Sequence, residues 1–212
     1  MKAISLDLDS ANSSPGFLAN EDLNPYIRLS DCSQVSDGAS AILLVSEKGL
    51  SKLGKSESDV VEVVGRGHAV ASLFEDGDFT QLDTTALAAE KAYRDAGVEP
   101  SQIQIAEVHD CFAVTELMMY EAMGLAELGK GADLLKDGTV AIDGRCPVNT
   151  GGGLIGFGHP VGATGVKQVF EIYRQMKGLC GDYQVSNNPQ IGMTLNMGGD
   201  DKTVVSLILK NG

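Results

Sequence analysis

Two short segments of the chain hold side chains that could move a proton or stabilise a negative charge on a substrate. The first reads His109-Asp110-Cys111-Phe112, so an imidazole and a thiol stand two positions apart. If the chain bends here, both side chains can reach one pocket, where a thiol of low pKa beside an imidazole would suit proton shuttling. A buried structural cysteine beside a hydrogen-bonded histidine explains the same residues, so both interpretations stay open for this segment alone.

The second segment, residues 149–165, is rich in glycine and contains His159. It reads NTGGGLIGFGHPVGATG, with seven glycines in 17 residues. Because each glycine costs conformational entropy on folding, this density indicates backbone that must approach a ligand or another loop closely. A neutral His159 at such a place could take a proton from a thiol and make it a stronger nucleophile. A glycine-rich turn that happens to hold a histidine explains the segment about as well, whereas a phosphate loop fits poorly because no Gly-Lys-Ser/Thr ending follows.

The remaining histidine and the other cysteines lack such surroundings. His68 is expected to have no catalytic role, and Cys146 and Cys180 are expected to be ordinary small apolar residues. The four cysteines include no Cys-x-x-Cys pair, so neither a disulfide scaffold nor a zinc ribbon is indicated, and no metal site is expected. This pattern fits a reducing compartment such as the cytoplasm, with a peroxisomal or mitochondrial matrix still open.

The composition argues against two classes of partner. The chain carries 29 acidic and 16 basic residues, a net charge of −13, which would repel nucleic acid. No run of about 18 apolar residues is present, so no membrane partner is expected. Residues 1–7 do not resemble a secretory signal, and residues 209–212 form no recognisable peroxisomal address. Residues 1–30 are polar and are expected to be irregular.

The hydrophobic pattern predicts strands that alternate with helices, followed by a closing pair of strands. Strands are expected at residues 39–46, 60–64, 103–108, 191–196 and 203–209, and helices at residues 84–96, 113–124 and 163–177. Asp83 is expected to cap the start of the first helix, and Gly97 to end it. Val114, Leu117 and Met118 are expected to share one face of the second helix. The whole pattern indicates an α/β domain with helices covering the sheet.

Together the two segments resemble the thiolase superfamily, and in particular its sterol-carrier-protein type. Thiolases carry a GHPxGxSG-like motif near the C-terminus, which residues 158–165 match as GHPVGATG. Most thiolases carry Asn-Glu-Ala-Phe at the other site, whereas the sterol-carrier type carries His-Asp-Cys-Phe, as residues 109–112 do here. The resemblance extends from about Asn24 to Leu209, nearly the whole chain.

For the fold, the resemblance implies a thiolase-like layered α/β structure with a mixed five-stranded sheet covered by helices. Residues 1–58 would be the tail of the thiolase N-terminal domain, a loop and its last strand, and residues 59–212 would be the C-terminal domain. None of the four cysteines has the Cys-Ser-Ser-like context of the thiolase nucleophile. The chain is therefore expected to be inactive alone, and its expected partners are acyl-CoA and either a thiolase N-terminal half or further copies in a homo-oligomer.

For the activity, the resemblance implies a two-step acyl transfer of the kind used in fatty-acid β-oxidation. A cysteine takes the acyl group from a 3-oxoacyl-CoA, and the thiol of a second coenzyme A removes it. Acyl-CoA is thus a substrate, and no permanently bound cofactor is implied. By position, His159 would activate the cysteine, and His109 would help to form an oxyanion hole in place of the usual asparagine. One lost donor in such a hole costs roughly 3–4 kcal/mol.

The resemblance assigns further residues by position. Other thiolases place an acid/base cysteine in a late Cys-x-Gly motif, but here the matching triplet is Asn-Met-Gly and ends at Gly198. By this resemblance Cys111 would act as the acid/base cysteine, and the amide of Gly198 can still donate to an oxyanion. Ser33 matches a serine near the pantetheine arm of coenzyme A, and Gly152 and Gly158 are expected to contact the same ligand.

Two other functions stay open. Thiolase-like aldolases, which cleave steroid side-chain CoA esters by a retro-aldol reaction, resemble this chain, but they tend to carry tyrosine in place of His109 and depart from the GHPxG pattern. A non-catalytic thiolase-like subunit that binds a partner or acyl-CoA would account for the missing nucleophile.

Overall fold

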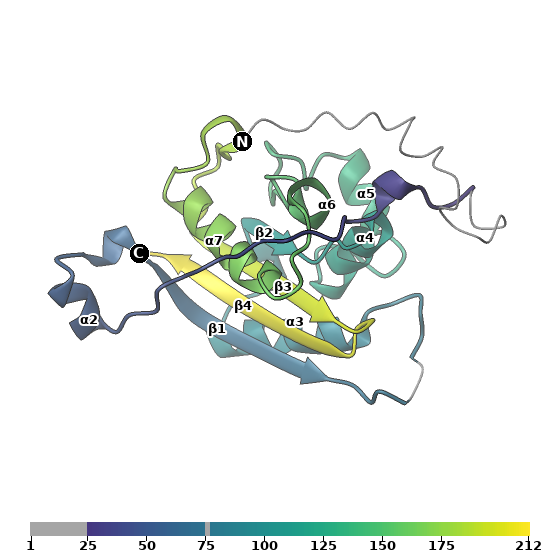
Figure 1. The fold of residues 1–212 in the computed structure, drawn as a ribbon, viewed down its shortest axis with the longest axis horizontal. Coiled ribbons are helices and arrows are strands. Elements are labelled where there is room, and N and C mark those ends of the chain that lie inside the picture. The colour runs from purple at the N-terminus through teal and green to yellow at the C-terminus, as the bar shows by residue number, and fades with distance from the viewer. Residues whose placement is uncertain (1–24, 75–76) are drawn as a thin grey trace.

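The computed structural model describes residues 25–74 and 77–212, which form a sheet with helices on both faces (Figure 1). The strands are β1 (Val61–Val70), β2 (Ile105–Val108), β3 (Ile191–Gly198) and β4 (Thr203–Asn211). Their order across the sheet is β1-β4-β3-β2; β2 runs parallel to β3, and the other neighbours are antiparallel. The predicted α/β class, mixed sheet and closing pair of strands are confirmed. The irregular N-terminal part that we predict lies largely outside the described residues.

Helices cover both faces of this sheet. The α-helices of the described residues are α2 (Glu47–Lys52), α3 (Asp83–Ala96), α4 (Ala113–Ala122), α5 (Gly131–Lys136), α6 (Gly153–Phe157) and α7 (Thr164–Met176). α3 and α4 pack on one face, and α7 packs on the other (Figure 1). None of these helices is long and apolar enough to cross a membrane.

Two apolar clusters hold the layers together. On one face, Tyr93 of α3 and Met119 of α4 pack with Val108 of β2. On the other face, Ile172 of α7 packs with Ile105 of β2. Every residue of β2 is buried, and burying one such aliphatic side chain contributes about 1.5–3 kcal/mol. β2, which leads into residues 109–112, is therefore packed on both of its faces.

The sheet has four regular strands rather than the predicted five. Residues 147–149 run beside β2 where a fifth strand would lie: Ala106 N donates to Pro147 O at 2.9 Å, and Asn149 N donates to Ala106 O at 3.0 Å. Pro147 has no N–H to continue a ladder, and Asn149 adopts a φ of 49° that turns the chain away. The fifth strand is thereby reduced to a single bridge.

The predicted strand at residues 39–46 is wrong. The segment forms no strand, and four consecutive apolar side chains in it are exposed: Ile42, Leu43, Leu44 and Val45. A strand needs a neighbour for its backbone N–H and C=O groups, and no strand of the described chain lies beside this segment. Its β-forming composition therefore has no partner within the part of the chain that the structure describes.

β1 is longer than the predicted strand at residues 60–64, because its glycines do not end it. Gly65 and Gly67 instead let α3 lie directly against the strand. A Cβ atom at Gly67 would collide with the carbonyl oxygen of Ala88 in α3. Glycine inside a strand commonly marks such a close approach of another backbone.

α3 confirms the predicted helix and its end, but the cap at its start differs from the prediction. Gly97 follows the helix with a φ of 67°, the left-handed conformation of a glycine C-cap. At the start, the carboxylate of Asp201 accepts from Thr84 N at 2.8 Å and from Thr85 N at 2.9 Å, whereas Asp83 caps nothing. Hydrogen bonds thus connect the turn between β3 and β4 to the start of α3.

The sequence pattern of α4 does not specify which of its faces packs on the sheet. The helix buries Thr115, Met119 and Tyr120, and Val114 is 57% exposed. Apolar residues occur on several sides of this helix, so the period of the pattern cannot select the face that packs.

Candidate active site

β2 and β3 bring His109 and Asn196 side by side. Val108, the last residue of β2, pairs with Leu195 of β3, so the next residue of each chain segment lies at the same end of the sheet. The Nδ1 atom of His109 lies 2.9 Å from Oδ1 of Asn196. Because a carboxamide oxygen only accepts, this contact places a proton on Nδ1 and leaves Nε2 without one in the neutral ring.

The glycine-rich segment places His159 just before the start of α7. Its Nδ1 atom lies 2.7 Å from Oγ1 of Thr164, and the Thr164 hydroxyl donates to Pro160 O at 3.3 Å. A hydroxyl that donates to a carbonyl is free to accept from the ring, so His159 also carries its proton on Nδ1. Its Nε2 is then the basic atom, as abstraction of a thiol proton requires.

The two imidazoles meet edge to face. Their centroids are 4.9 Å apart and their planes are inclined by 86°. Among the described residues, neither Nε2 atom has a hydrogen-bonding partner. Burial lowers the pKa of both rings; for His109 the Asn196 contact partly offsets this effect, and His159 nearby lowers the pKa further. Both rings are therefore neutral, and able to accept a proton, near neutral pH.

Cys111 lies at the same corner, but no hydrogen bond joins its thiol to either imidazole within the described part of the chain. Its Sγ atom is 3.9 Å from Oγ1 of Thr115, and burial raises the pKa of the thiol. The thiol of low pKa considered above is thus not what the structure shows; a protonated thiol suits a proton donor instead. The four cysteines are free, and residues 25–74 and 77–212 contain no cluster of three side chains that could hold a metal ion.

Residues 32–38 form a strap that lies across both loops of the site, seen as the purple segment passing β2 and α7 (Figure 1). Ser33 N donates to Cys111 O at 2.8 Å, and His159 N donates to Gln34 O at 3.3 Å. The strap therefore joins the corner at Cys111 to the loop that carries His159. It also places Ser33 directly beside the backbone of that corner.

The glycines that the resemblance names have conformational reasons of their own. Gly152 and Gly158 have φ angles of 106° and 92°, which other residues rarely adopt. The space beside Gly158 is filled by Ser36, so packing within the chain already accounts for that glycine. Gly198 lies two positions beyond Asn196 at the end of β3, on the same face of the strand.

Three residues whose side chains bond the loops of the site are not recognised from the sequence. Thr164, described above, is the first residue of α7 and follows the N-cap residue Ala163. Asn149 accepts from Val108 N at 2.9 Å and donates to Oε2 of Glu116 at 3.1 Å. Its place just before the glycine run was a possible signal, because asparagine tolerates positive φ. The third is Asp110, which is buried and accepts from a backbone amide of the glycine-rich segment.

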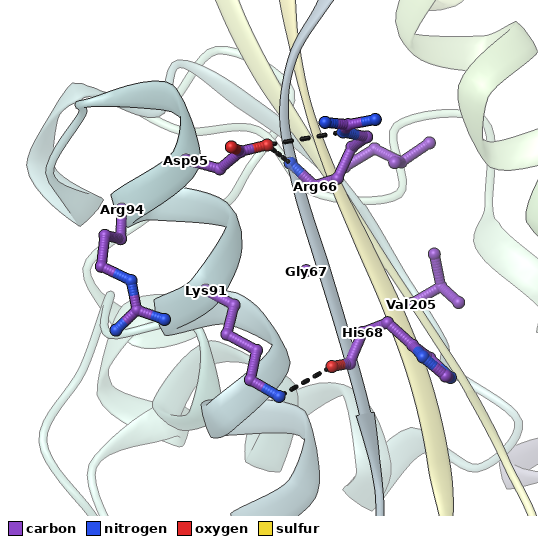
Figure 2. A pocket seen from close by; sticks show the side chains of 8 residues that line it. Arg66, Gly67, His68, Lys91, Arg94, Asp95 and Val205 are labelled. Atoms are coloured by element: carbon purple, nitrogen blue, oxygen red, sulfur yellow. Dashed lines mark hydrogen bonds and ion pairs between the residues drawn. The ribbon is translucent and has the colours of Figure 1, made fainter.

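A separate hollow of about 730 Å³ lies at the edge of β1 (Figure 2). It is lined by residues of β1, α3 and β4: Arg66, Gly67, His68, Lys91, Arg94, Asp95, Val205 and Leu207. Lys91 Nζ donates to His68 O at 2.9 Å, and Arg66 N donates to Asp95 at 3.0 Å, so side chains of α3 already bind the exposed edge of the strand. β1 and β2 are at opposite edges of the sheet, and the hollow therefore lies apart from the imidazole pair.

Known proteins are similar to this chain in sequence. A family model described as thiolase C-terminal domain-like matches residues 65–211. Acetyl-CoA acetyltransferase of Methanothermobacter thermautotrophicus is 38% identical over 180 residues, a match that covers 84% of this chain and 46% of that protein. Sterol carrier protein 2 of Homo sapiens is 35% identical over 195 residues, covering 90% of this chain and 35% of that protein.

Solved structures also share the fold, and one example is an aldolase. The Ltp2-ChsH2(DUF35) aldolase matches with a TM-score of 0.63 and 22% identity, over 71% of this chain and 39% of that chain. At this identity the likeness concerns the fold alone. The chain spans less than half the length of these relatives.

Proposed function

Because the chain belongs to the thiolase C-terminal domain-like family, as its two motifs predict, we propose that it is the C-terminal part of a thiolase-type acyltransferase. Its substrates would be 3-oxoacyl-CoA and acetyl-CoA, with no permanently bound cofactor. The observation that supports this function best is the imidazole pair. The rings of His109 and His159 are in contact, each is oriented by a hydrogen bond at Nδ1, and each has an unprotonated Nε2.

In the proposed first step, His159 acts as the base. Its Nε2 takes the proton of a cysteine thiol supplied by the N-terminal half, and the thiolate attacks the C3 carbonyl carbon of the 3-oxoacyl-CoA. The C2–C3 bond breaks, its electron pair stays on C2, and the acyl group remains on the cysteine. The Thr164 hydroxyl supports this step, because its bond to Nδ1–H strengthens when the ring becomes charged.

Cys111 is the proposed acid. Its half-buried, protonated thiol gives a proton to C2, so that acetyl-CoA leaves as a neutral thioester. The resulting thiolate then takes the proton of the incoming coenzyme A thiol. That sulfur attacks the acyl-enzyme carbonyl, and the bond to the nucleophilic cysteine breaks. Acyl-CoA leaves, and the departing cysteine thiolate takes its proton back from His159.

His109 and the amide of Gly198 are the proposed oxyanion donors. With its proton on Nδ1, the His109 ring donates through Nε2 only after gaining a second proton, or when the Asn196 amide turns so that its NH₂ group faces Nδ1. Asn196 therefore controls whether His109 serves as a donor or as a base.

Coenzyme A is proposed to bind beside Ser33 and the loop that holds Gly152 and Gly158. A hollow of about 400 Å³ between the strap and the start of α7 supports this position, because it begins at the residue that follows His159. It is lined by residues of both segments: Ser36, Asp37, Gly38, Ala39, Ser40, Pro160, Val161, Gly162 and Ala163.

A thiolase N-terminal half is the proposed source of the nucleophile, with residues 1–58 belonging to its domain and residues 59–212 forming the C-terminal domain. The exposed apolar side chains of residues 42–45 support this partner, since a neighbouring strand would remove them from water. A homo-oligomer that covers the same segment is the alternative arrangement. The free cysteines are compatible with a reducing compartment such as the cytoplasm.

Mixing two polypeptides tests the proposal. The chain is combined with the N-terminal half of the Methanothermobacter relative, and thiolysis of acetoacetyl-CoA is followed by the loss of its enolate absorbance. We expect activity from the mixture, none from either polypeptide alone, and none after His159→Ala. A His68→Ala chain, altered at the opposite edge of the sheet, is the control and stays active. Thiolysis by the isolated chain, or a stable complex without activity, would contradict the proposal.

Retro-aldol cleavage is the second candidate, and the fold it shares with the aldolase motivates it. The presence of His109 and an intact Gly-His-Pro sequence counts against it. The two reactions are separable because aldol cleavage consumes no coenzyme A, whereas thiolysis consumes one molecule per turnover. A chain that binds acyl-CoA in the mixture but performs neither reaction would be the non-catalytic subunit.

A further inference from the structure

Asp110 is a buried carboxyl group placed between the two residues that carry chemistry in the first segment. Its side chain is only 2% exposed, although its neighbours His109 and Cys111 face the site. The carboxylate accepts from Leu154 N at 2.7 Å and from Ile155 N at 3.4 Å. Both amides belong to α6, in the glycine-rich segment, so Asp110 bonds the loop that leads to His159.

Gly153 shows how closely the loop fits this carboxylate. Its φ is 58°, and a Cβ atom at this position would collide with the carboxylate of Asp110. A glycine is therefore required here for two separate reasons, the backbone conformation and the space that the carboxylate takes. The third glycine of the run thus faces a residue of this chain, and not a ligand.

A short chain of bonds connects Asp110 to His159. Leu154, which donates to the carboxylate, accepts through its own carbonyl from Gly158 N at 2.9 Å, and Gly158 immediately precedes His159. At the other end, Asp110 directly follows His109. The carboxylate is therefore the side chain that links the backbone of one imidazole to the backbone of the other.

We propose that Asp110 is a positioning residue for the acyl transfer: its carboxylate holds the loop of residues 151–158 against the end of β2 and so keeps His109 and His159 in edge-to-face contact. The role of Asp110 in catalysis rests on the proposed function, but the contact between His109 and His159 can be measured without turnover. Failure of this inference is therefore distinguishable from failure of the proposed function.

The imidazole spectrum of the full chain provides the test, because the chain has only 3 histidines. Wild-type protein should show a cross-peak between the ring protons of His109 and His159, whose centroids are 4.9 Å apart, while His68 supplies a separate signal from the far edge of the sheet. In Asp110→Ala we expect the cross-peak to be lost and the Leu154 amide to exchange faster with solvent.

Asp110→Asn and Asp201→Asn form a matched pair. Each replaces one oxygen of a carboxylate that accepts from two consecutive backbone amides, at α6 and at α3 respectively. We expect Asp110→Asn to weaken the cross-peak and Asp201→Asn to leave it unchanged. If the alanine variant does not fold, the asparagine variant carries the measurement. A wild-type cross-peak in every folded Asp110 variant, or equal weakening in Asp201→Asn, would overturn the inference.

Discussion

Replacing Thr164 by valine removes the hydroxyl that orients His159 and leaves the volume of the side chain nearly unchanged. Thr164 is 3% exposed, and its Oγ1 atom lies 2.7 Å from Nδ1 of the ring. Without this acceptor, the proton of the neutral ring is no longer held on Nδ1. The Nε2 atom, which must be bare to take the thiol proton, is then protonated in part of the population.

The size of the effect follows from the charge on the ring during proton transfer. The bond from Nδ1–H to the hydroxyl becomes charge-assisted when His159 is an imidazolium, and such a bond contributes about 1.5–3 kcal/mol. Loss of that amount from the transition state lowers the rate roughly tenfold to a hundredfold. The free energy of unfolding should fall by only about 1 kcal/mol, the net value of one neutral hydrogen bond.

Two measurements on the reconstituted mixture separate these effects: kcat/KM for acetoacetyl-CoA thiolysis, and urea unfolding of the chain. Thr85→Val is the matched control, because Thr85 is equally buried and its Oγ1 atom bonds Asp201 at 2.6 Å, away from the imidazoles. We expect the control to lose similar stability and keep its activity. Full activity in Thr164→Val, or an equal loss in Thr85→Val, would refute the orienting role of the hydroxyl.

Three further predictions concern charge and packing. Asn196→Asp should raise the pKa of His109, since a carboxylate at 2.9 Å favours the imidazolium; an NMR titration that shows no shift would mean that the two side chains do not touch. Burial raises the pKa of Glu107 to about 7, so the folded chain holds a proton that the unfolded chain releases at lower pH. The free energy of unfolding should therefore decrease as the pH rises from the usual pKa of a carboxyl group to about 7. Glu107→Gln should remove part of this pH dependence in urea unfolding at several pH values. Gly67→Ala should destabilise the chain by about 1–3 kcal/mol or more, because the methyl group meets the backbone of α3, whereas Gly162→Ala, with open space around it, should cost little in thermal unfolding.

Local sequence signals were sufficient for the elements that carry the candidate residues. The β-branched and apolar run before His109 predicts β2, and the glycine-rich motif before α7 singles out His159. What the motifs do not contain is the bonding between distant parts of the chain. Asn196 and His109 are 87 positions apart, and the Asp201 cap on Thr85 spans 116 positions. Such pairs exist only because β3, β4 and the turn between them fold back on the rest of the domain.

The errors have the same origin. Residues 39–46 have the composition of a strand, but a strand forms only beside another strand, and none of the described ones is available to it. Residues 147–149 lie where a fifth strand would be, yet proline at 147 and the positive φ of Asn149 limit them to one bridge. At residues 39–46 the missing neighbour decided the outcome, and at residues 147–149 the backbone geometry did.

We propose that this chain supplies the base to a cysteine on another polypeptide. The test is intact-mass spectrometry of the mixture with the N-terminal half, after brief exposure to acetyl-CoA. We expect an acetyl adduct on the partner's cysteine, no adduct on this chain, and loss of the adduct when His159→Ala replaces the wild-type chain. An adduct on one of the chain's own four cysteines, or a partner that is acetylated equally well with His159→Ala, would contradict it.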